Sequence, residues 1–306
     1  MSIVRTDVPT TAKLCDDTIQ ALTERYPSCS TELLTLTAYG RPIRSLILGT
    51  GARKVLFTAA HHANEWITAP VLLKFVEDLA QAAEDGEGLG DVDAKTLLEQ
   101  VTVYTVPMVD PDGVALVTGE LTPEDPGYAA AREIAQSFPQ ILFPTGWKAN
   151  LAGTDLNLNY PAGWLQAREI KFMQGFDRPA PRDYVGRAPL DQPETRALAS
   201  YTEYVDPALV LAFHSQGQVI YWQFDDIFVP GAEELGQRLA QASGYALEDT
   251  PYNSAFAGYK DWFIQNFRRP GYTIEVGSGV NPLPLSQFDE IYRDNLGILV
   301  TAALGE

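Results

Sequence analysis

The stretch AAHHANEW at residues 59–66 decides the fold, because it directly follows the apolar run VLFT at residues 55–58. A short apolar run of this kind is typical of a buried strand. The strand delivers histidines and a carboxylate to its C-terminal end. His62 and Glu65 lie three residues apart, so both side chains can converge on one point if the strand breaks into a first helical turn at Asn64.

These residue types indicate a metal site. Zinc accepts imidazole nitrogen and carboxylate oxygen, and a catalytic zinc site generally has three protein ligands and leaves the fourth position to water. We therefore interpret His62 and Glu65 as two of the three ligands of one Zn²⁺ ion per chain.

The third ligand is expected from the remaining histidines, since the chain contains only His61, His62 and His214. His214 follows the apolar run ALVLAF at residues 208–213. In open α/β sheets, sites form beyond the carboxyl ends of strands, so two strands that end in histidine suggest one site. Each histidine taken alone is as readily a core or loop residue, but together they favour metal binding. Strand alternation turns His61 away from His62, and we interpret His61 as structural or as a support for the ligands.

The composition is that of a globular protein. Of the 306 residues, 45% are hydrophobic and 20% are charged, which is ordinary for a chain with a sizeable core. Single cores stop growing at around 250–300 residues, and we find no repeat or linker, so we expect one domain over residues 1–306. Lys and Arg number 22 against 40 Asp and Glu, for a net charge of −18. This charge repels nucleic acid and anionic membranes, and we expect neither as a partner.

The chain gives no sign of a targeting segment. Its first nine residues lack the apolar core of a signal peptide, and no later run approaches the length of a membrane span. Cys15 and Cys29 are too few for a disulfide scaffold, and free thiols suit a reducing compartment. We therefore expect a cytoplasmic protein.

Helical and strand patterns alternate along the chain. Apolar periodicity and Gly or Pro punctuation predict helices at residues 11–26, through 71–75, and at 192–205, 231–243, 260–267 and 285–303. Strands are predicted at residues 43–48, 55–60, 101–109, 208–213, 219–223 and 272–276, with another before residue 38. Between these elements we expect a Gly/Asp-rich loop at 85–92, a turn at 110–113 and an irregular insertion at 118–146. This order predicts an α/β fold with a mixed, largely parallel central sheet flanked by helices on both faces.

A zinc-bound water needs a proton acceptor, and hydrolysis needs positive charge where an oxyanion develops. Glu275 lies in the apolar strand GYTIEVG at residues 271–277, where a buried carboxylate is costly without a partner. We interpret Glu275 as the catalytic base; the alternative is an edge-strand Glu that faces solvent. Lys148, in GWKAN at residues 146–150, is the weaker candidate for the positive charge, because most lysines are solvated.

Taken in order, these motifs resemble those of the zinc carboxypeptidases typified by carboxypeptidases A and T, over nearly the whole chain. HANE at residues 62–65 is similar to the family's His-x-x-Glu metal motif, HS at 214–215 to its His-Ser pair, and TIE at 273–275 to the strand that carries its catalytic Glu. The DPDG motif at 110–113 and residues 184–195 also resemble family signatures. The resemblance implies a carboxypeptidase-like fold and a zinc peptidase.

Two departures from the family pattern point to one branch. Carboxypeptidases carry Asp-x-Asn-Arg-Asn, whose Asn and Arg bind the terminal carboxylate of the substrate. Here residues 155–159 read DLNLN, and Leu158 cannot form that ion pair. The family's oxyanion-stabilising Arg falls at Lys148. Together with NPLPLSQF at residues 281–288, these departures resemble the γ-D-glutamyl-meso-diaminopimelate peptidases, which cleave the bond between γ-D-Glu and the diamino acid in bacterial cell-wall peptides.

The resemblance implies a role for each candidate residue. His62, Glu65 and His214 hold Zn²⁺, Glu275 takes the proton of the attacking water, and Lys148 stabilises the oxyanion. The residues expected to contact a muropeptide substrate are Asn157, Ser215, Tyr252 and Lys260. Arg268 and Arg269 are further candidate cations, and the sequence does not show which way their side chains point. Lys260 is as readily an exposed lysine at the start of a helix.

Two alternatives remain open. One is a conventional metallocarboxypeptidase that releases C-terminal amino acids and uses a different cation for the terminal carboxylate. The other is an inactive zinc-binding module that only recognises wall peptides. A cytoplasmic enzyme of the proposed branch is expected to recycle or remodel free muropeptides.

Overall fold

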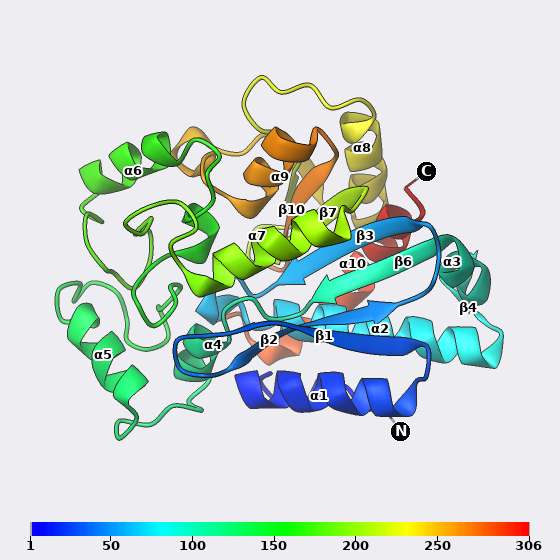
Figure 1. Ribbon diagram of the computed structural model, residues 1–306, viewed down its shortest axis with the longest axis horizontal. Helices are drawn as coiled ribbons and strands as arrows, with labels where there is room; N and C mark the ends of the chain where they lie inside the picture. Colours follow the sequence, from blue (N-terminus) through cyan, green and yellow to red (C-terminus); the bar gives the residue numbers. More distant parts are fainter. Residues whose placement is uncertain (1, 306) are drawn as a thin grey trace.

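The computed structural model describes residues 2–305, and its largest element is an eight-stranded mixed sheet (Figure 1). In spatial order its strands are β1 (Cys29–Leu36), β2 (Pro42–Leu48), β6 (Val101–Val106), β3 (Arg53–Ala59), β7 (Leu209–His214), β10 (Gly271–Glu275), β8 (Val219–Tyr221) and β9 (Ala246–Glu248). The central strands β6, β3, β7 and β10 run parallel, as do β8 and β9. The pairs β1–β2, β2–β6 and β8–β10 are antiparallel.

Helices pack on both faces of this sheet. One face carries α1 (Ala12–Arg25), α2 (Thr68–Asp85), α3 (Ala94–Gln100), α8 (Ala232–Ser243) and α10 (Phe288–Leu304), and the other carries α7 (Pro193–Val205) and α9 (Tyr259–Phe267) (Figure 1). Successive strand residues point to opposite faces, so Phe57 and Phe213 enter the first core while Leu56 and Ala212 enter the second. The predicted α/β class, with a mixed, largely parallel sheet between helical layers, is confirmed.

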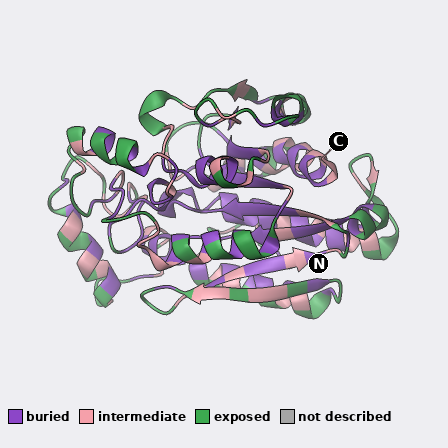
Figure 2. Ribbon diagram, turned by 45° about the horizontal axis from the view of Figure 1, so that its top comes forward, coloured by how far each residue is buried: buried purple, intermediate pink, exposed green. Residues whose placement is uncertain are grey.

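The register of the central strands brings their carboxyl ends to one edge. Ala59, at the end of β3, is paired with Phe213 of β7, and His214 is paired with Glu275 of β10. Strands buried on both faces read as near-continuous apolar runs, and every residue of β7 is buried. Figure 2 shows buried residues concentrated in the central sheet and exposed residues on the outward faces of the helices. Within residues 2–305, no helix combines the length and apolarity needed to cross a membrane.

Several sequence-based predictions are wrong in detail. The predicted turn at 110–113 is the start of a helix, α4 (Pro111–Val117), which Asp110 caps by accepting a hydrogen bond from the Gly113 N–H at 2.9 Å. The strand predicted at 101–109 ends at Val106, before Pro107. The insertion at 118–146 contains α5 (Pro126–Ala135), and the elements that the pattern did not reveal are α3, α6 (Trp164–Met173), β9 and the two-residue strands β4 (Gly88–Leu89) and β5 (Val92–Asp93) in the predicted loop. These elements are short, and a short segment offers too few turns for periodicity to stand out.

Gly113 marks a close contact between α4 and the segment that follows β3. A Cβ atom at this position would lie 2.2 Å from Asp110 Oδ2, 2.6 Å from the Ala149 carbonyl oxygen and 2.8 Å from Ala63 Cβ. Real Cβ atoms do not approach other atoms this closely, so the position requires glycine for space. Gly113 thereby holds the segment after β3 against the loop that carries Lys148.

We expect Gly113→Ala to lower the free energy of unfolding by about 1–3 kcal/mol, as for other overpacked sites, when measured by urea denaturation. The matched control is Gly236→Ala in α8, where the nearest atoms are the flexible ends of Leu247 at 3.0 and 3.2 Å. Because alanine has a higher helix propensity than glycine, Gly236→Ala should lower the free energy of unfolding by less than Gly113→Ala does. Equal stability of Gly113→Ala and wild type would contradict the proposed contact.

Candidate active site

The sheet edge at the end of β3 carries a short helical turn, as the His62–Glu65 spacing predicts. His62 is still extended, and Ala63–Glu65 form a 3₁₀ turn, η1. The Glu65 N–H donates to the His62 carbonyl at 3.1 Å, and the Thr68 hydroxyl donates to the Glu65 carbonyl at 2.8 Å. The Ala63 N–H donates to the Lys148 carbonyl at 3.0 Å. This turn places the side chains of His62 and Glu65 on the same side of the chain.

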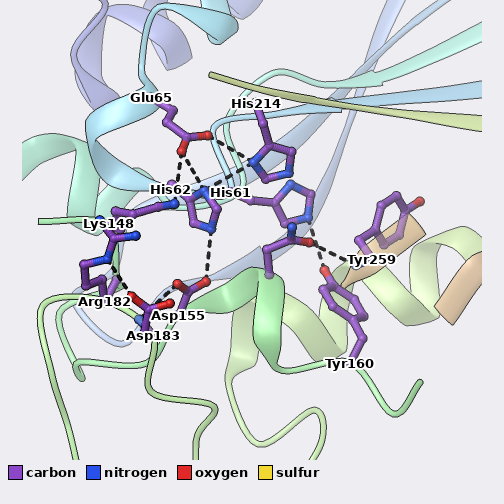
Figure 3. Close-up of polar contacts among 12 residues, drawn as sticks. His61, His62, Glu65, Lys148, Asp155, Tyr160, Arg182, Asp183, His214 and Tyr259 are labelled. Carbon is purple, nitrogen blue, oxygen red and sulfur yellow. Dashed lines mark hydrogen bonds and ion pairs between the residues drawn. The ribbon is translucent and has the colours of Figure 1, made fainter. Parts of the chain in front are cut away.

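His62, Glu65 and His214 converge to form a buried three-residue cluster (Figure 3). The Glu65 carboxylate lies 2.9 Å from His62 Nδ1 and 3.0 Å from His214 Nδ1, and the two Nδ1 atoms are 3.2 Å apart. Exposed fractions are 6% for His62 and 1% for both Glu65 and His214. The structure thus brings together the three ligands that the sequence predicts.

The donor set and spacing fit a zinc ion. Two ring nitrogens that face each other cannot both carry a proton, whereas both can present lone pairs to a cation. Zinc is held at about 2.0–2.2 Å by nitrogen and oxygen, so tetrahedral ligand atoms lie roughly 3.3 Å from one another. Two histidines and one glutamate are also a known catalytic zinc set. His62, Glu65 and His214 are therefore the residues that would hold the metal.

The second ring nitrogen of His62 is bound by Asp155, a residue that our sequence analysis did not assign to the site. His62 Nε2 lies 3.0 Å from Asp155 Oδ1, and Asp155 Oδ2 accepts a hydrogen bond from the Asp183 N–H at 3.1 Å. Burial by itself would lower the pKa of His62, but the charges of Glu65 and Asp155 outweigh it and raise that pKa to about 9. A metal-ligating histidine generally donates its other N–H to such a carboxylate, and this rule was the signal that could have identified Asp155.

His61 packs behind the cluster, as expected for a structural residue. Its Nε2 atom lies 3.3 Å from the Tyr160 hydroxyl, and its ring stacks on that of His214 with centroids 5.5 Å apart. Burial and the two neighbouring histidines hold the pKa of His61 well below its ordinary value. A neutral ring in this position supports His214 without adding charge to the site.

Glu275 and Lys148 line the same cavity as His62, a cavity of about 200 Å³. β10 lies between β7 and β8, so the alternative of an edge-strand glutamate is wrong. Burial, and after it the charge of Glu65, raises the pKa of Glu275 to about 8. Lys148 Nζ lies 3.4 Å from Glu65 Oε1. Burial opposes the charge of Lys148, but Glu65 and Asp155 outweigh burial and raise its pKa.

The four predicted substrate contacts divide into two groups. Asn157 and Lys260 line the cavity, whereas Tyr252 and Ser215 do not. Lys260 is only 4% exposed, so the alternative of an exposed lysine is wrong. The Tyr252 side chain is 69% exposed and packs edge-on against Phe256. The Ser215 N–H donates to Glu65 at 3.1 Å, while its hydroxyl donates to Asn281.

The position of the missing arginine is apolar. Leu158 lines the cavity, but it is 7% exposed and belongs to a small apolar cluster with Trp164, Val185 and Ala257. A charge at this position would be buried without a partner, which is costly. Of the other cations considered from sequence, Arg269 bonds Asp206 and Pro207, and neither it nor Arg268 lines the cavity. The sequence analysis missed two cations that do line it, Lys171 and Arg182.

A buried carboxyl group, Glu194, lies where two of the family-like motifs meet. Asn150, two residues after Lys148, donates from Nδ2 to Gln192 at 2.9 Å and lies 3.4 Å from Glu194 Oε2. Glu194 is 2% exposed. Burial raises its pKa to about 7, with a further contribution from the charge of Asp112. The motifs at 146–150 and 184–195 therefore meet through hydrogen bonds at the buried Glu194.

Comparison with known proteins adds four findings. The family model described as zinc carboxypeptidase matches residues 15–297. The γ-D-glutamyl-L-diamino acid endopeptidase 1 of Lysinibacillus sphaericus is 40% identical over 284 residues, which cover 92% of this chain and 69% of that protein. Among solved structures, carboxypeptidase A from Helicoverpa armigera superposes with a TM-score of 0.71 at 19% identity, covering 98% of this chain and 73% of that one. The murein-tripeptide amidase from Escherichia coli O157 superposes with a TM-score of 0.55 at 21% identity, covering 89% and 92%.

We expect Asp155→Asn to weaken zinc binding by about 10- to 100-fold, the usual effect of losing a partner of a ligating histidine. The new amide NH₂, a donor, would face either the Asp183 N–H or the His62 N–H, and in both orientations His62 loses its charged partner. Competition with a chelator of known affinity measures the change. Asp177→Asn, an exposed carboxylate paired with Arg178, is the control and should bind zinc as wild type does. Unchanged affinity in Asp155→Asn would remove Asp155 from the site.

Glu194→Gln is expected to change how stability depends on pH. Because the pKa of Glu194 is about 7 in the folded chain and near 4.3 when unfolded, the folded chain retains a proton that the unfolded chain loses, and stability falls as pH rises through this window. The difference in free energy of unfolding between Glu194→Gln and wild type should therefore shift in favour of the variant by about 2 kcal/mol between pH 5 and pH 8. Urea denaturation of the metal-free protein measures it. Glu203→Gln, exposed on the same helix, is the control; parallel pH curves for Glu194→Gln and wild type would contradict the raised pKa.

Proposed function

Because this chain belongs to the zinc carboxypeptidase family, we propose that it hydrolyses the amide bond between γ-D-Glu and meso-diaminopimelate in bacterial cell-wall peptides. The observation that carries this proposal is a His₂Glu cluster whose His62 lines one cavity together with Glu275, Lys148 and an apolar Leu158. The first three features suit peptide hydrolysis. Leu158 argues against the capture of a terminal carboxylate at that position. The similarity to a γ-D-glutamyl-L-diamino acid endopeptidase supports the wall-peptide substrate.

In the proposed reaction, each polar residue has a distinct task. Zinc, when bound, supplies a Lewis acid and lowers the pKa of water. Glu275 accepts a proton from the attacking water and returns it to the leaving amine. A carboxyl group with a pKa of about 8 has both protonation states within reach near neutral pH, as a group that takes and returns a proton requires. Lys148 stabilises the negative charge that develops on the scissile carbonyl oxygen.

The supporting residues keep these groups in place. Asp155 orients the His62 ring, and the Ser215 N–H donates a hydrogen bond to the Glu65 carboxylate. The Asn157 side-chain oxygen accepts a hydrogen bond from the Tyr259 N–H at 3.0 Å, which leaves its amide NH₂ to meet the substrate. A contact between Tyr252 and the substrate requires the Tyr252 loop to move, and this contact stays a prediction.

The location also stays a prediction. Cys15 and Cys29 are both free and buried, which is compatible with a reducing compartment. We propose that the enzyme acts in the cytoplasm on free muropeptides. Fractionation of cells that express the natural protein tests this.

We expect the zinc-loaded protein to release diaminopimelate from L-Ala-γ-D-Glu-meso-diaminopimelate, and a chelator to stop the release, as followed by mass spectrometry. Glu275→Gln should lower kcat by about 10²- to 10⁴-fold, the usual contribution of general acid–base catalysis, while it retains zinc. Glu248→Gln, an exposed glutamate on β9, is the matched control and should keep full activity.

Two results would change the assignment. Cleavage of conventional C-terminal residues without release of diaminopimelate would overturn the substrate and leave the metal site in place. Loss of zinc from Glu275→Gln would show that Glu275 belongs to the metal site and is not the base.

A further inference from the structure

Four positively charged side chains line the cavity: Lys148, Lys171, Arg182 and Lys260. The chain as a whole carries a net charge of −18, so an anionic substrate is repelled by the general field and needs local positive charge. Leu158 provides none. A substrate carboxylate must therefore be bound by one of these four side chains.

Two of the four are held by protein partners. Lys260 Nζ donates to the Gln223 carbonyl at 2.6 Å and to Asp261 Oδ1 at 2.5 Å, and the residue is 4% exposed. Lys171 Nζ donates to Asp183 Oδ1 at 2.7 Å, and its side chain is 8% exposed. Both ammonium groups are compensated by a buried or half-buried carboxylate.

Lys148 is directed to the metal cluster. Its Nζ atom lies 3.4 Å from Glu65 Oε1, and its side chain is 19% exposed. In the proposed function this charge meets the oxyanion that develops at the scissile carbonyl. It is therefore not available to a second anionic group of the substrate.

Arg182 remains. Its Nε atom donates to Asp183 Oδ2 at 2.6 Å, and its side chain is 43% exposed. Within residues 2–305, no protein group accepts a hydrogen bond from either terminal nitrogen of its guanidinium group. These nitrogens form the part of the planar fork that binds a carboxylate through two parallel hydrogen bonds.

The backbone holds Arg182 close to the reacting groups. The N–H groups of Lys148 and Ala149 both donate to the Pro181 carbonyl, at 2.8 and 3.0 Å. On the other side of Arg182, the Asp183 N–H donates to Asp155, which binds His62. Figure 3 shows Arg182 on the same flank of the histidine cluster as Lys148.

Asp183 fixes the direction of the guanidinium group. Its carboxylate accepts from Lys171 on one oxygen and from Arg182 on the other, so this group of three carries one net positive charge. Asp183 adopts a left-handed backbone conformation with φ of 65°, which is uncommon for a residue with a side chain. The surrounding hydrogen bonds hold it there and aim the remaining positive charge at the cavity.

We propose that Arg182 is the specificity-determining residue of this site and binds a carboxylate of the substrate next to the scissile amide. This inference rests on the proposed function. In γ-D-Glu–diaminopimelate peptides, the carboxylate has two sources: the α-carboxylate of D-Glu on the acyl side and a carboxylate of diaminopimelate on the amine side. Arg182 takes the place of the arginine that Leu158 replaces, from a different segment of the chain.

The test compares wild type, Arg182→Gln and Arg182→Lys on three zinc-dependent cleavage substrates. These are L-Ala-γ-D-Glu-meso-diaminopimelate, the same peptide with a carboxamide at the D-Glu α-carbon, and the same peptide with carboxamides on diaminopimelate. Arg182→Gln should lower kcat/KM for the first peptide by about 10- to 100-fold, the worth of a charged hydrogen-bonded pair. Arg182→Lys keeps the charge without the fork and should fall between wild type and Arg182→Gln.

The amidated peptides identify the source of the carboxylate. The analogue that lacks the bound carboxylate should be cleaved equally well by wild type and Arg182→Gln, and the other analogue should show the full loss. Since the substrates are compared within each variant, partial unfolding cancels from the ratios. Arg178→Gln is the control, because Arg178 is 57% exposed, pairs with Asp177 and does not line the cavity; it should behave as wild type on all three.

Binding provides a readout independent of turnover. Calorimetry on Glu275→Gln should show that adding Arg182→Gln weakens binding of the first peptide by about tenfold or more. An equal loss on all three peptides, or no loss, overturns the role of Arg182 and leaves the proposed function in place. If wild type neither binds nor cleaves any of the three, both the proposed function and this inference are wrong.

Discussion

The Glu65 carboxylate is the group on which the rest of the site depends. It is 1% exposed and is approached by His62, His214, the Ser215 N–H and Lys148. A buried carboxylate is tolerated only when several donors or cations surround it. These partners come from η1, from the end of β7 and from the loop before η2 (Leu156–Leu158). The requirement to satisfy one charge therefore joins three segments that are far apart in the sequence, and the parallel register of β3 and β7 makes the meeting possible.

Around this carboxylate, the supports are arranged in successive contacts. Asp155 holds the His62 ring, Asp183 holds Asp155 through its N–H, and Gly113 allows α4 to pack against the turn that carries Glu65. Burial of these groups excludes water, so charges act on each other more strongly than they would in solvent. The pKa values of the two carboxyl groups move in opposite directions for different reasons. The charges of His62 and Lys148 outweigh burial and hold the pKa of Glu65 well below its ordinary value, whereas burial, followed by the charge of Glu65, raises the pKa of Glu275.

Fold and specificity are separable in this chain. The sheet and its helical layers are shared with carboxypeptidases at below 20% identity, so the architecture places few demands on individual side chains. One part of the cavity wall comes from the region between β6 and α7, where Lys148, Leu158 and Arg182 lie outside the strands. Changes in such loops alter which part of a substrate is bound without disturbing the strands that carry the metal cluster. The four cations that line the cavity stand beside four acidic residues, Asp155, Asp183, Asp261 and Glu275, so attraction of an anionic substrate depends on which cation is left without a protein partner.

The sequence by itself determined the features that depend on local spacing. Apolar runs revealed the buried strands, and the three-residue interval between His62 and Glu65 determined that both could point to one place, because one helical turn fixes their direction. Motif order was enough to select His214 and Glu275. Only the tertiary structure decided that Glu275 lies off the edge of the sheet, that Asp155 binds His62, that Lys260 is paired with Asp261, and that Arg182 reaches the cavity while Tyr252 does not. These placements depend on which distant segments pack together, and hydrogen bonds between residues 28 or 93 positions apart produce no periodic pattern in the sequence.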